Sequence, residues 1–141
     1  MPANESVRNW MTADPITVSA DASLPEADKL MKEHNIRRLP VMKGVALVGI
    51  ITRGDVRGAD ASEATSLSIF ELTRLPNSLA VSEVMHKPVV SGDPEMTVGA
   101  AAWVTLEHKI AGLPILDDGK LVGIINESDI FRMVVEKWQF A

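Results

Sequence analysis

Apolar residues form one helical pattern and two β-rich runs in the first half of this chain. Between 24 and 34 they recur at the spacing of a helix with one buried face. Two β-rich runs follow at 39–42 and 46–51, separated by the turn Lys43-Gly44. A further helix is expected to begin at Asp55. The pattern predicts a helix, a β-hairpin and a second helix.

The second half repeats this succession in register. Position 97 aligns with position 23, and the alignment continues without a gap to 131 and 57. The turn Asp117-Asp118-Gly119 is a strong hairpin signal. Before each unit, a short helix ending at Met11 or Met85 leads into a predicted strand, at 16–18 or 89–90. Residues identical in both copies include Ala27/Ala101, His34/His108, Ile36/Ile110, Leu39/Leu113, Pro40/Pro114, Leu47/Leu121, Gly49/Gly123, Ile51/Ile125 and Asp55/Asp129.

The predicted fold class is α/β (α+β), with two tandem β-α-β-β-α repeats packed with pseudo-two-fold symmetry, since neither repeat alone is large enough for a core. The repeats are expected at 1–58 and 80–141, the latter ending in a helix over 130–140. The linker, 59–79, is predicted to begin as a polar loop over 58–66 and to contain a short helix near 67–72.

Composition excludes several classes of protein and site. The chain has no cysteine, so it has no disulfide, thiolate metal ligand or cysteine nucleophile. It has no apolar run long enough to span a bilayer, and its first residues are polar, so we expect a cytoplasmic protein without membrane insertion. The net charge of −5 lies in residues 61–141, with six basic and eleven acidic side chains, which argues against nucleic acid as a partner. An anion would have to be bound by a local basic cluster.

The strand-to-helix junctions carry the candidate chemistry. Thr52 precedes Asp55 by three residues, and Asn126 precedes Asp129 by the same spacing. In one interpretation the Thr or Asn side chain caps the helix and the Asp complements its dipole. In the other, free N–H groups and a hydroxyl at the helix start bind phosphate, while the Asp accepts hydrogen bonds from a ribose. Both interpretations can hold at once.

The doubled pattern of Leu39-Pro40-Val41 followed by Gly49-Ile50-Ile51-Thr52-Arg53-Gly54-Asp55 resembles a pair of CBS domains, also called a Bateman module. The resemblance covers about residues 6–58 and 80–135. It implies two clefts that commonly bind AMP, ADP or ATP, with S-adenosylmethionine and NAD as alternative ligands. Proteins of this family act as sensors for enzymes, channels and transporters.

Carried over by position, the resemblance implies two unequal nucleotide sites. Thr52 supplies the hydroxyl, Asp55 binds the ribose, and Arg37 and Arg38 contact phosphates, although adjacent arginines are also common in solvated loops. The adenine of this site would contact Pro88, Val89, Ile110, Ala111 and Gly112. The second site is expected to be weaker or empty, since Ala111-Gly112 replaces the arginine pair. Its residues would be Ile16, Thr17, Ile36, Asn126 and Asp129.

The helix predicted over 98–108 has an apolar outer face, formed by Ala100, Trp103 and Leu106. Such a face indicates a partner surface, and pairs of CBS modules typically stack through these helices, so a homodimer is expected. Alternatively, Trp103 lies beneath the linker or the C-terminal helix. His34 and His108 are interpreted as helix-end residues rather than metal ligands, and no metal is required.

No catalytic motif is present, so the chain is not expected to be an enzyme. The sequence therefore predicts a stand-alone regulatory module that binds an adenine nucleotide and signals to a separate, unknown effector protein. The alternative is a structural dimerisation module without a ligand.

Overall fold

The structure is a computed structural model that describes residues 5–64 and 79–138. The chain forms two compact units, each built around one of the predicted hairpins. We call Ile16–Val89 the first-repeat unit, and Met1–Pro15 together with Val90–Ala141 the second-repeat unit.

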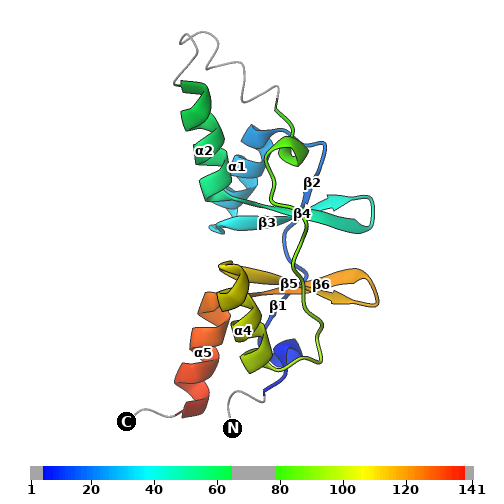
Figure 1. The fold of residues 1–141 in the computed structure, drawn as a ribbon, viewed down its shortest axis with the longest axis vertical. Coiled ribbons are helices and arrows are strands. Elements are labelled where there is room, and N and C mark those ends of the chain that lie inside the picture. The colour runs from blue at the N-terminus through cyan, green and yellow to red at the C-terminus, as the bar shows by residue number, and fades with distance from the viewer. Residues whose placement is uncertain (1–4, 65–78, 139–141) are drawn as a thin grey trace. The chain divides into compact units, whose positions relative to one another are not determined.

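The first-repeat unit contains a three-stranded sheet covered by helices (Figure 1). In the sheet order β2-β3-β4, β2 runs parallel to β3 and β3 forms an antiparallel hairpin with β4. The Ser23 hydroxyl caps α1, and the core packs α1 residues Leu24 and Met31 against Leu39 and Ile51 of the sheet. The elements are β2 (Val18–Ser19), α1 (Leu24–Glu33), β3 (Arg38–Lys43), β4 (Ala46–Thr52), α2 (Arg53–Ala64) and the 3-10 turn η3 (Val81–Glu83).

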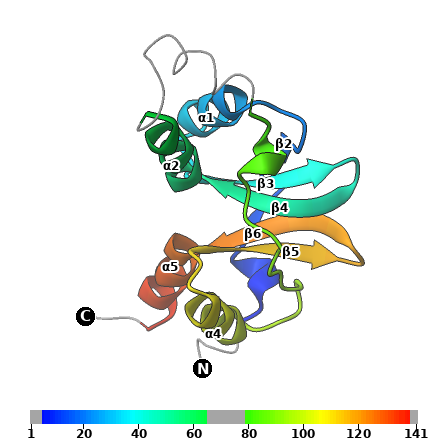
Figure 2. The same cartoon turned by 45° about the horizontal axis from the view of Figure 1, so that its top comes forward.

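The second-repeat unit repeats the hairpin and its two helices (Figure 2). Its sheet has the order β1-β6-β5, with every pair antiparallel. Asp118 and Gly119 form the hairpin turn with φ of 52° and 79°, the left-handed region that this turn requires. The elements are the 3-10 turn η2 (Val7–Asn9), β1 (Thr12–Ala13), α4 (Val98–His108), β5 (Gly112–Asp117), β6 (Lys120–Asn126) and α5 (Glu127–Trp138).

The leading segment of each repeat packs into the unit formed by the other repeat. Val7 is fully buried in the core of the second-repeat unit, and Val81 is fully buried in the core of the first-repeat unit. Gly49 shows why a glycine is needed under this segment, since a Cβ there would overlap the Met85 side chain and lie 3.0 Å from the carbonyl oxygen of His86. Gly123 is covered by Met11 in the same way. The identical Gly and Met pairs thus build the same exchanged contact twice.

Two local predictions were wrong. The loop expected over 58–66 is helical as far as Ala64, because alanines, the strongest helix formers, follow Gly58 and Ala59 packs against the core. The strand expected at 89–90 is absent, and isolated bridges at His86 and Gly92 flank that position instead. In the first repeat, Thr12–Ala13 and Val18–Ser19 are the strands, so Ile16 and Thr17 precede β2. The helix predicted near 67–72 lies outside the described residues.

Candidate functional site

The β4–α2 junction is held by two reciprocal hydrogen bonds. The Asp55 N–H donates to Thr52 Oγ1 at 3.1 Å, and the Thr52 N–H donates to Asp55 Oδ2 at 2.8 Å. This is the geometry of a capping box, so the capping interpretation is confirmed for Thr52. A hydroxyl that accepts one hydrogen bond still has its own proton to donate. The capping role therefore leaves Thr52 able to donate to a phosphate or ribose oxygen.

The second oxygen of Asp55 has a partner that sequence reasoning missed. His86 Nε2 lies 2.6 Å from Asp55 Oδ1, with the Asp55 side chain 13% exposed. Two backbone hydrogen bonds with Ile50, at 2.8 and 3.2 Å, hold His86 beside β4. The only sequence signal was that His86 directly follows Met85, which the repeat pairs with Met11. Asp55 is thus fixed by its own helix and by the exchanged segment.

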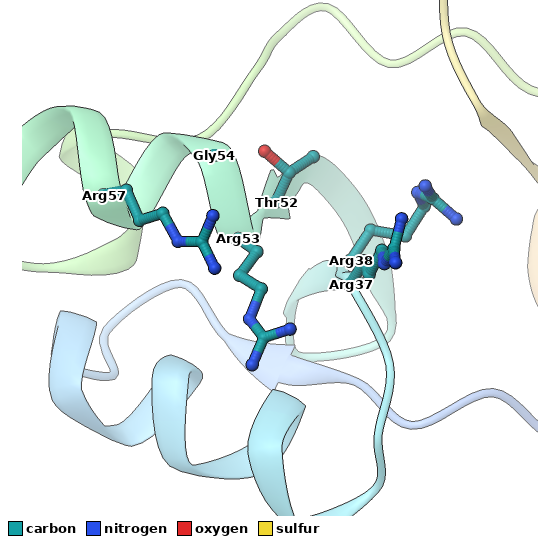
Figure 3. Close-up of a pocket in the computed structure, with 6 residues that line it drawn as sticks. All are labelled: Arg37, Arg38, Thr52, Arg53, Gly54 and Arg57. Atoms are coloured by element: carbon teal, nitrogen blue, oxygen red, sulfur yellow. The ribbon is translucent and has the colours of Figure 1, made fainter.

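A pocket of about 400 Å³ opens beside this junction and contains four arginines (Figure 3). The Arg53 N–H donates to the carbonyl oxygen of Arg37 at 2.8 Å, and Arg38 is the register partner of Thr52. The start of β3 and the start of α2 are therefore tied together by the backbone. The residues lining the pocket are Arg37, Arg38, Thr52, Arg53, Gly54 and Arg57.

Sequence reasoning identified Arg37 and Arg38 but overlooked Arg53 and Arg57. Their signal was the four-residue spacing, which places both side chains on one face of α2. Among the residues whose side chains the structure describes, 5–59 and 79–138, no acidic side chain lines the pocket and no carboxylate pairs with Arg37, Arg53 or Arg57. Guanidinium groups recognise phosphate and carboxylate oxygens with charge-assisted, often bidentate hydrogen bonds. The pocket is therefore suited to a phosphate-bearing ligand.

The β6–α5 junction repeats the backbone but not the charge. The Asn126 N–H donates to Asp129 Oδ2 at 2.9 Å, and the Glu127 N–H donates to the carbonyl oxygen of Ala111 at 3.0 Å. Asp129 Oδ1 lies 3.3 Å from an Arg132 nitrogen. The positions that match the four pocket arginines hold Ala111, Gly112, Glu127 and Phe131. The matching positions therefore provide no basic side chain.

The remaining predicted contacts are divided between the two units. Pro88 and Val89 end the first-repeat unit, whereas Ile110, Ala111 and Gly112 lie at the start of β5 in the second-repeat unit. Of the weaker site, Ile16, Thr17 and Ile36 belong to the first-repeat unit, and Asn126 and Asp129 to the second. The assignment of these residues to an adenine or to a second ligand stays a prediction.

The outer face of α4 is exposed as the sequence suggested. Trp103 is 62% and Leu106 78% exposed, and Ala100 is exposed beside them. In the described part of the structure, α5 therefore does not cover Trp103. The neighbouring helix α5 adds further exposed apolar side chains, namely Phe131, Val135 and Trp138.

The described residues show neither a metal cluster nor a membrane-spanning helix. Residues 5–64 and 79–138 contain no cluster of three or more His, Cys, Asp or Glu side chains that could hold a metal ion. Within the same ranges, none of the helices has the length and apolar character needed to cross a membrane. His34 and His108 are exposed at the ends of α1 and α4, as predicted.

The doubled fold and the paired strand-to-helix junctions define a tandem-repeat module of the CBS type. The CBS domain family matches residues 7–62 and 81–136, and the chain belongs to this family. It is 34% identical to the CBS domain-containing protein YhcV of Bacillus subtilis, over 89% of this chain and 82% of that protein. It is also 35% identical to inosine-5'-monophosphate dehydrogenase of Korarchaeum cryptofilum, where the match covers 92% of this chain and only 24% of the enzyme.

Solved structures show the same fold. The structure of CBSX2 in complex with AMP is similar with a TM-score of 0.80 and 25% identity, covering 96% of this chain and 99% of that chain. The CBS domain pair of MJ0100 in complex with 5'-methylthioadenosine and S-adenosyl-L-methionine is similar with a TM-score of 0.77 and 29% identity. The match covers 94% of this chain and 97% of that chain.

Proposed function

We propose that this chain is a cytoplasmic, non-catalytic regulatory module that binds an adenine nucleotide (AMP, ADP or ATP) at the β4–α2 junction. The observation that carries the proposal is the arginine-lined pocket directly beside the Thr52–Asp55 capping box. The signal would pass to a separate effector protein. A second copy of the chain is a further proposed partner, through the exposed apolar side chains of α4.

Each polar group at the junction has a role in the proposed complex. Arg37 and Arg38 bind phosphate oxygens, and the Thr52 hydroxyl donates one more hydrogen bond. Asp55 accepts from the ribose hydroxyls, because each of its oxygens has lone pairs beyond those used by Thr52 and His86. The proposed adenine contacts, with Pro88 and Val89 among them, follow the sequence assignment.

The relatives support the class of ligand. CBSX2 was solved with AMP, and the MJ0100 pair with two other adenosine derivatives. In the matched dehydrogenase the CBS pair makes up about a quarter of the chain, which fits a regulatory part rather than a catalytic one. A sensor of this kind works only if its ligand binds one conformational state more tightly than another.

Thermal melts with AMP, ADP, ATP, NAD and S-adenosylmethionine test the proposal. A nucleotide at 100 times its dissociation constant should add about 2.7 kcal/mol to the free energy of unfolding. Asp55→Ala should weaken binding by about 1.5–3 kcal/mol, since it removes a charged hydrogen-bond acceptor.

Asp129→Ala is the matched control, because Asp129 accepts the same backbone hydrogen bond at the β6–α5 junction. Both variants lose a cap, whereas only Asp55→Ala should lose the ligand-induced shift. If none of the five compounds stabilises the native chain, the nucleotide proposal fails and a ligand-free dimerisation module becomes the better description.

A further inference from the structure

We propose that the arginine pocket selects nucleotides with two or three phosphates over AMP and S-adenosylmethionine, and that Arg53 and Arg57 determine this specificity. The inference rests on the proposed function and identifies the class of nucleotide within it. It is drawn from residues that the family resemblance did not assign.

The number of guanidinium groups exceeds what a single phosphate needs. A phosphomonoester carries a charge of about −1.5 to −2 at neutral pH, which two arginines balance. Arg37 and Arg38 already supply that charge at the start of β3. Arg53 and Arg57 add two further positive charges to the same pocket, and its described lining residues include no acidic side chain. A di- or triphosphate supplies the matching negative charge, whereas S-adenosylmethionine brings a positively charged sulfonium.

The arginines are also spread along the pocket rather than gathered at one point. Figure 3 shows Arg57 and the Arg37–Arg38 pair on opposite sides of Thr52, with the Arg57 side chain extending along α2 toward Arg53. The pocket volume of about 400 Å³ is within the range of small-molecule sites. An extended chain of phosphates has more oxygens than a single phosphate with which to contact both groups of arginines.

The placement of Arg53 and Arg57 is unfavourable for the helix itself. Arg53 is the first residue of α2, where the helix dipole repels a cation. Arg57 lies four residues later on the same face, and like charges at this spacing repel each other. The matching helix α5 begins with Glu127, which the dipole favours, and has Phe131 at the second position. A bound polyphosphate would offset both the repulsion of Arg53 by the helix dipole and the repulsion between Arg53 and Arg57, because its negative charges attract both side chains.

The test is isothermal calorimetry with AMP, ADP, ATP, S-adenosylmethionine and inorganic tripolyphosphate, in EDTA at one ionic strength. For the native chain we expect ATP to bind at least about tenfold more tightly than AMP, a difference of about 1.4 kcal/mol. Arg57→Gln should remove most of that difference while changing AMP affinity less than about threefold. Arg53→Gln should act in the same direction.

Arg8→Gln is the control, because it makes the same charge change in the second-repeat unit, where Arg8 pairs with Glu95 rather than lining the pocket. It should leave the ATP-to-AMP ratio unchanged. Equal affinities of the native chain for ATP and AMP would overturn the inference, as would an Arg57→Gln variant that weakens both nucleotides equally.

The failure of the inference and of the proposed function can be told apart. Suppose that AMP binds the native chain, that Asp55→Ala abolishes AMP binding, and that ATP binds the native chain no more tightly than AMP does. Then only the polyphosphate inference fails. If no nucleotide binds, the proposed function fails. Tripolyphosphate binding as tightly as ATP would support selection by charge and would contradict recognition of the nucleoside.

Discussion

The two strand-to-helix junctions of this chain have the same backbone and opposite electrostatics. At β4–α2 and at β6–α5 an Asp in the first helical turn accepts the N–H of the last strand residue, at 2.8 and 2.9 Å. A backbone hydrogen bond to the residue before the hairpin closes each junction, at 2.8 and 3.0 Å. Around this common frame, the first junction has four arginines and the second has none at the matching positions.

The difference separates the residues that hold the junction from those proposed to recognise a ligand. The β6–α5 junction has the same backbone hydrogen bonds with its hairpin and its capping Asp129 but without the arginines. The arginines of the first junction are therefore not required by the architecture, and two of them oppose the dipole of α2. Residues that work against local stability without an evident structural gain are expected at functional sites.

The first helices of the two repeats differ in a similar way. The exposed face of α1 carries ion pairs at helical spacing, Lys29 with Glu33 and Lys32 with Asp28. The exposed face of α4 instead presents Trp103 and Leu106. Large exposed aromatic side chains are typical of interface centres, whereas exposed ion pairs are typical of a solvated surface. The asymmetry supports the proposal that copies of the chain associate through α4 rather than α1.

The largest expected effect is on nucleotide affinity, when the arginine pair of the β4–α2 junction is replaced by the Ala-Gly pair found at the β6–α5 junction. Arg37→Ala combined with Arg38→Gly should weaken nucleotide binding by about 100-fold or more, because charge-assisted hydrogen bonds contribute about 1.5–3 kcal/mol each. Calorimetry with the tightest-binding nucleotide measures the loss. Circular dichroism should show an intact fold, since Ala111 and Gly112 occupy these positions in the other repeat. Unchanged affinity would mean that the pair is a solvated loop.

A charge on the outer face of α4 should separate a dimer into monomers. In Trp103→Glu the carboxylate would have to be buried at the contact, which weakens association by about tenfold or more. Multi-angle light scattering across a concentration series measures the change. Lys29→Glu alters the matching position of α1 and serves as the control. A Trp103→Glu variant that remains dimeric would contradict the interface assignment.

The smallest expected effect is on the stability of α2 without ligand. Arg53→Glu copies Glu127 and should raise the free energy of unfolding by about 0.3–1 kcal/mol at low salt, because an anion suits a helix N-terminus. That change corresponds to a melting point higher by about 1–4 °C. Scanning calorimetry of the free chain measures it, and Glu127→Arg should give a shift of opposite sign. A lower melting point in Arg53→Glu would show that Arg53 stabilises the free chain.

Much of the architecture could be predicted from the sequence, because the determinants are local or repeated. The helical spacing of apolar residues located α1 and α4, and β-rich runs on either side of a turn located both hairpins. Because the chain is a repeat, each prediction could be made twice. The Thr52–Asp55 spacing predicted the capping box. The loop expected over 58–66 was wrong because small and polar residues there suggested a loop, whereas the alanines among them favour the helix that continues to Ala64.

The candidate site was predicted only in part, because its members come from separate elements. Arg37 and Arg38 were visible as an adjacent pair before the hairpin. Arg53 and Arg57 were marked only by their four-residue spacing. They join the pocket because α2 continues from β4 and brings its first turns beside the start of β3. His86 lies beside Asp55 because a backbone bridge to Ile50 holds it next to β4, and no local sequence pattern indicates that bridge.

The sequence alone determined the two-fold repetition, the hairpins, the capped helices and the imbalance of charge between the junctions. These features depend on periodicity, turn chemistry and residue type within a short window. The tertiary structure decided which leading segment packs on which hairpin, with Met85 over Gly49 and Met11 over Gly123. The two leading segments are alike enough that their local pattern fits either hairpin. Only packing of distant residues into one core selects the exchanged arrangement, and that arrangement brings His86 to Asp55.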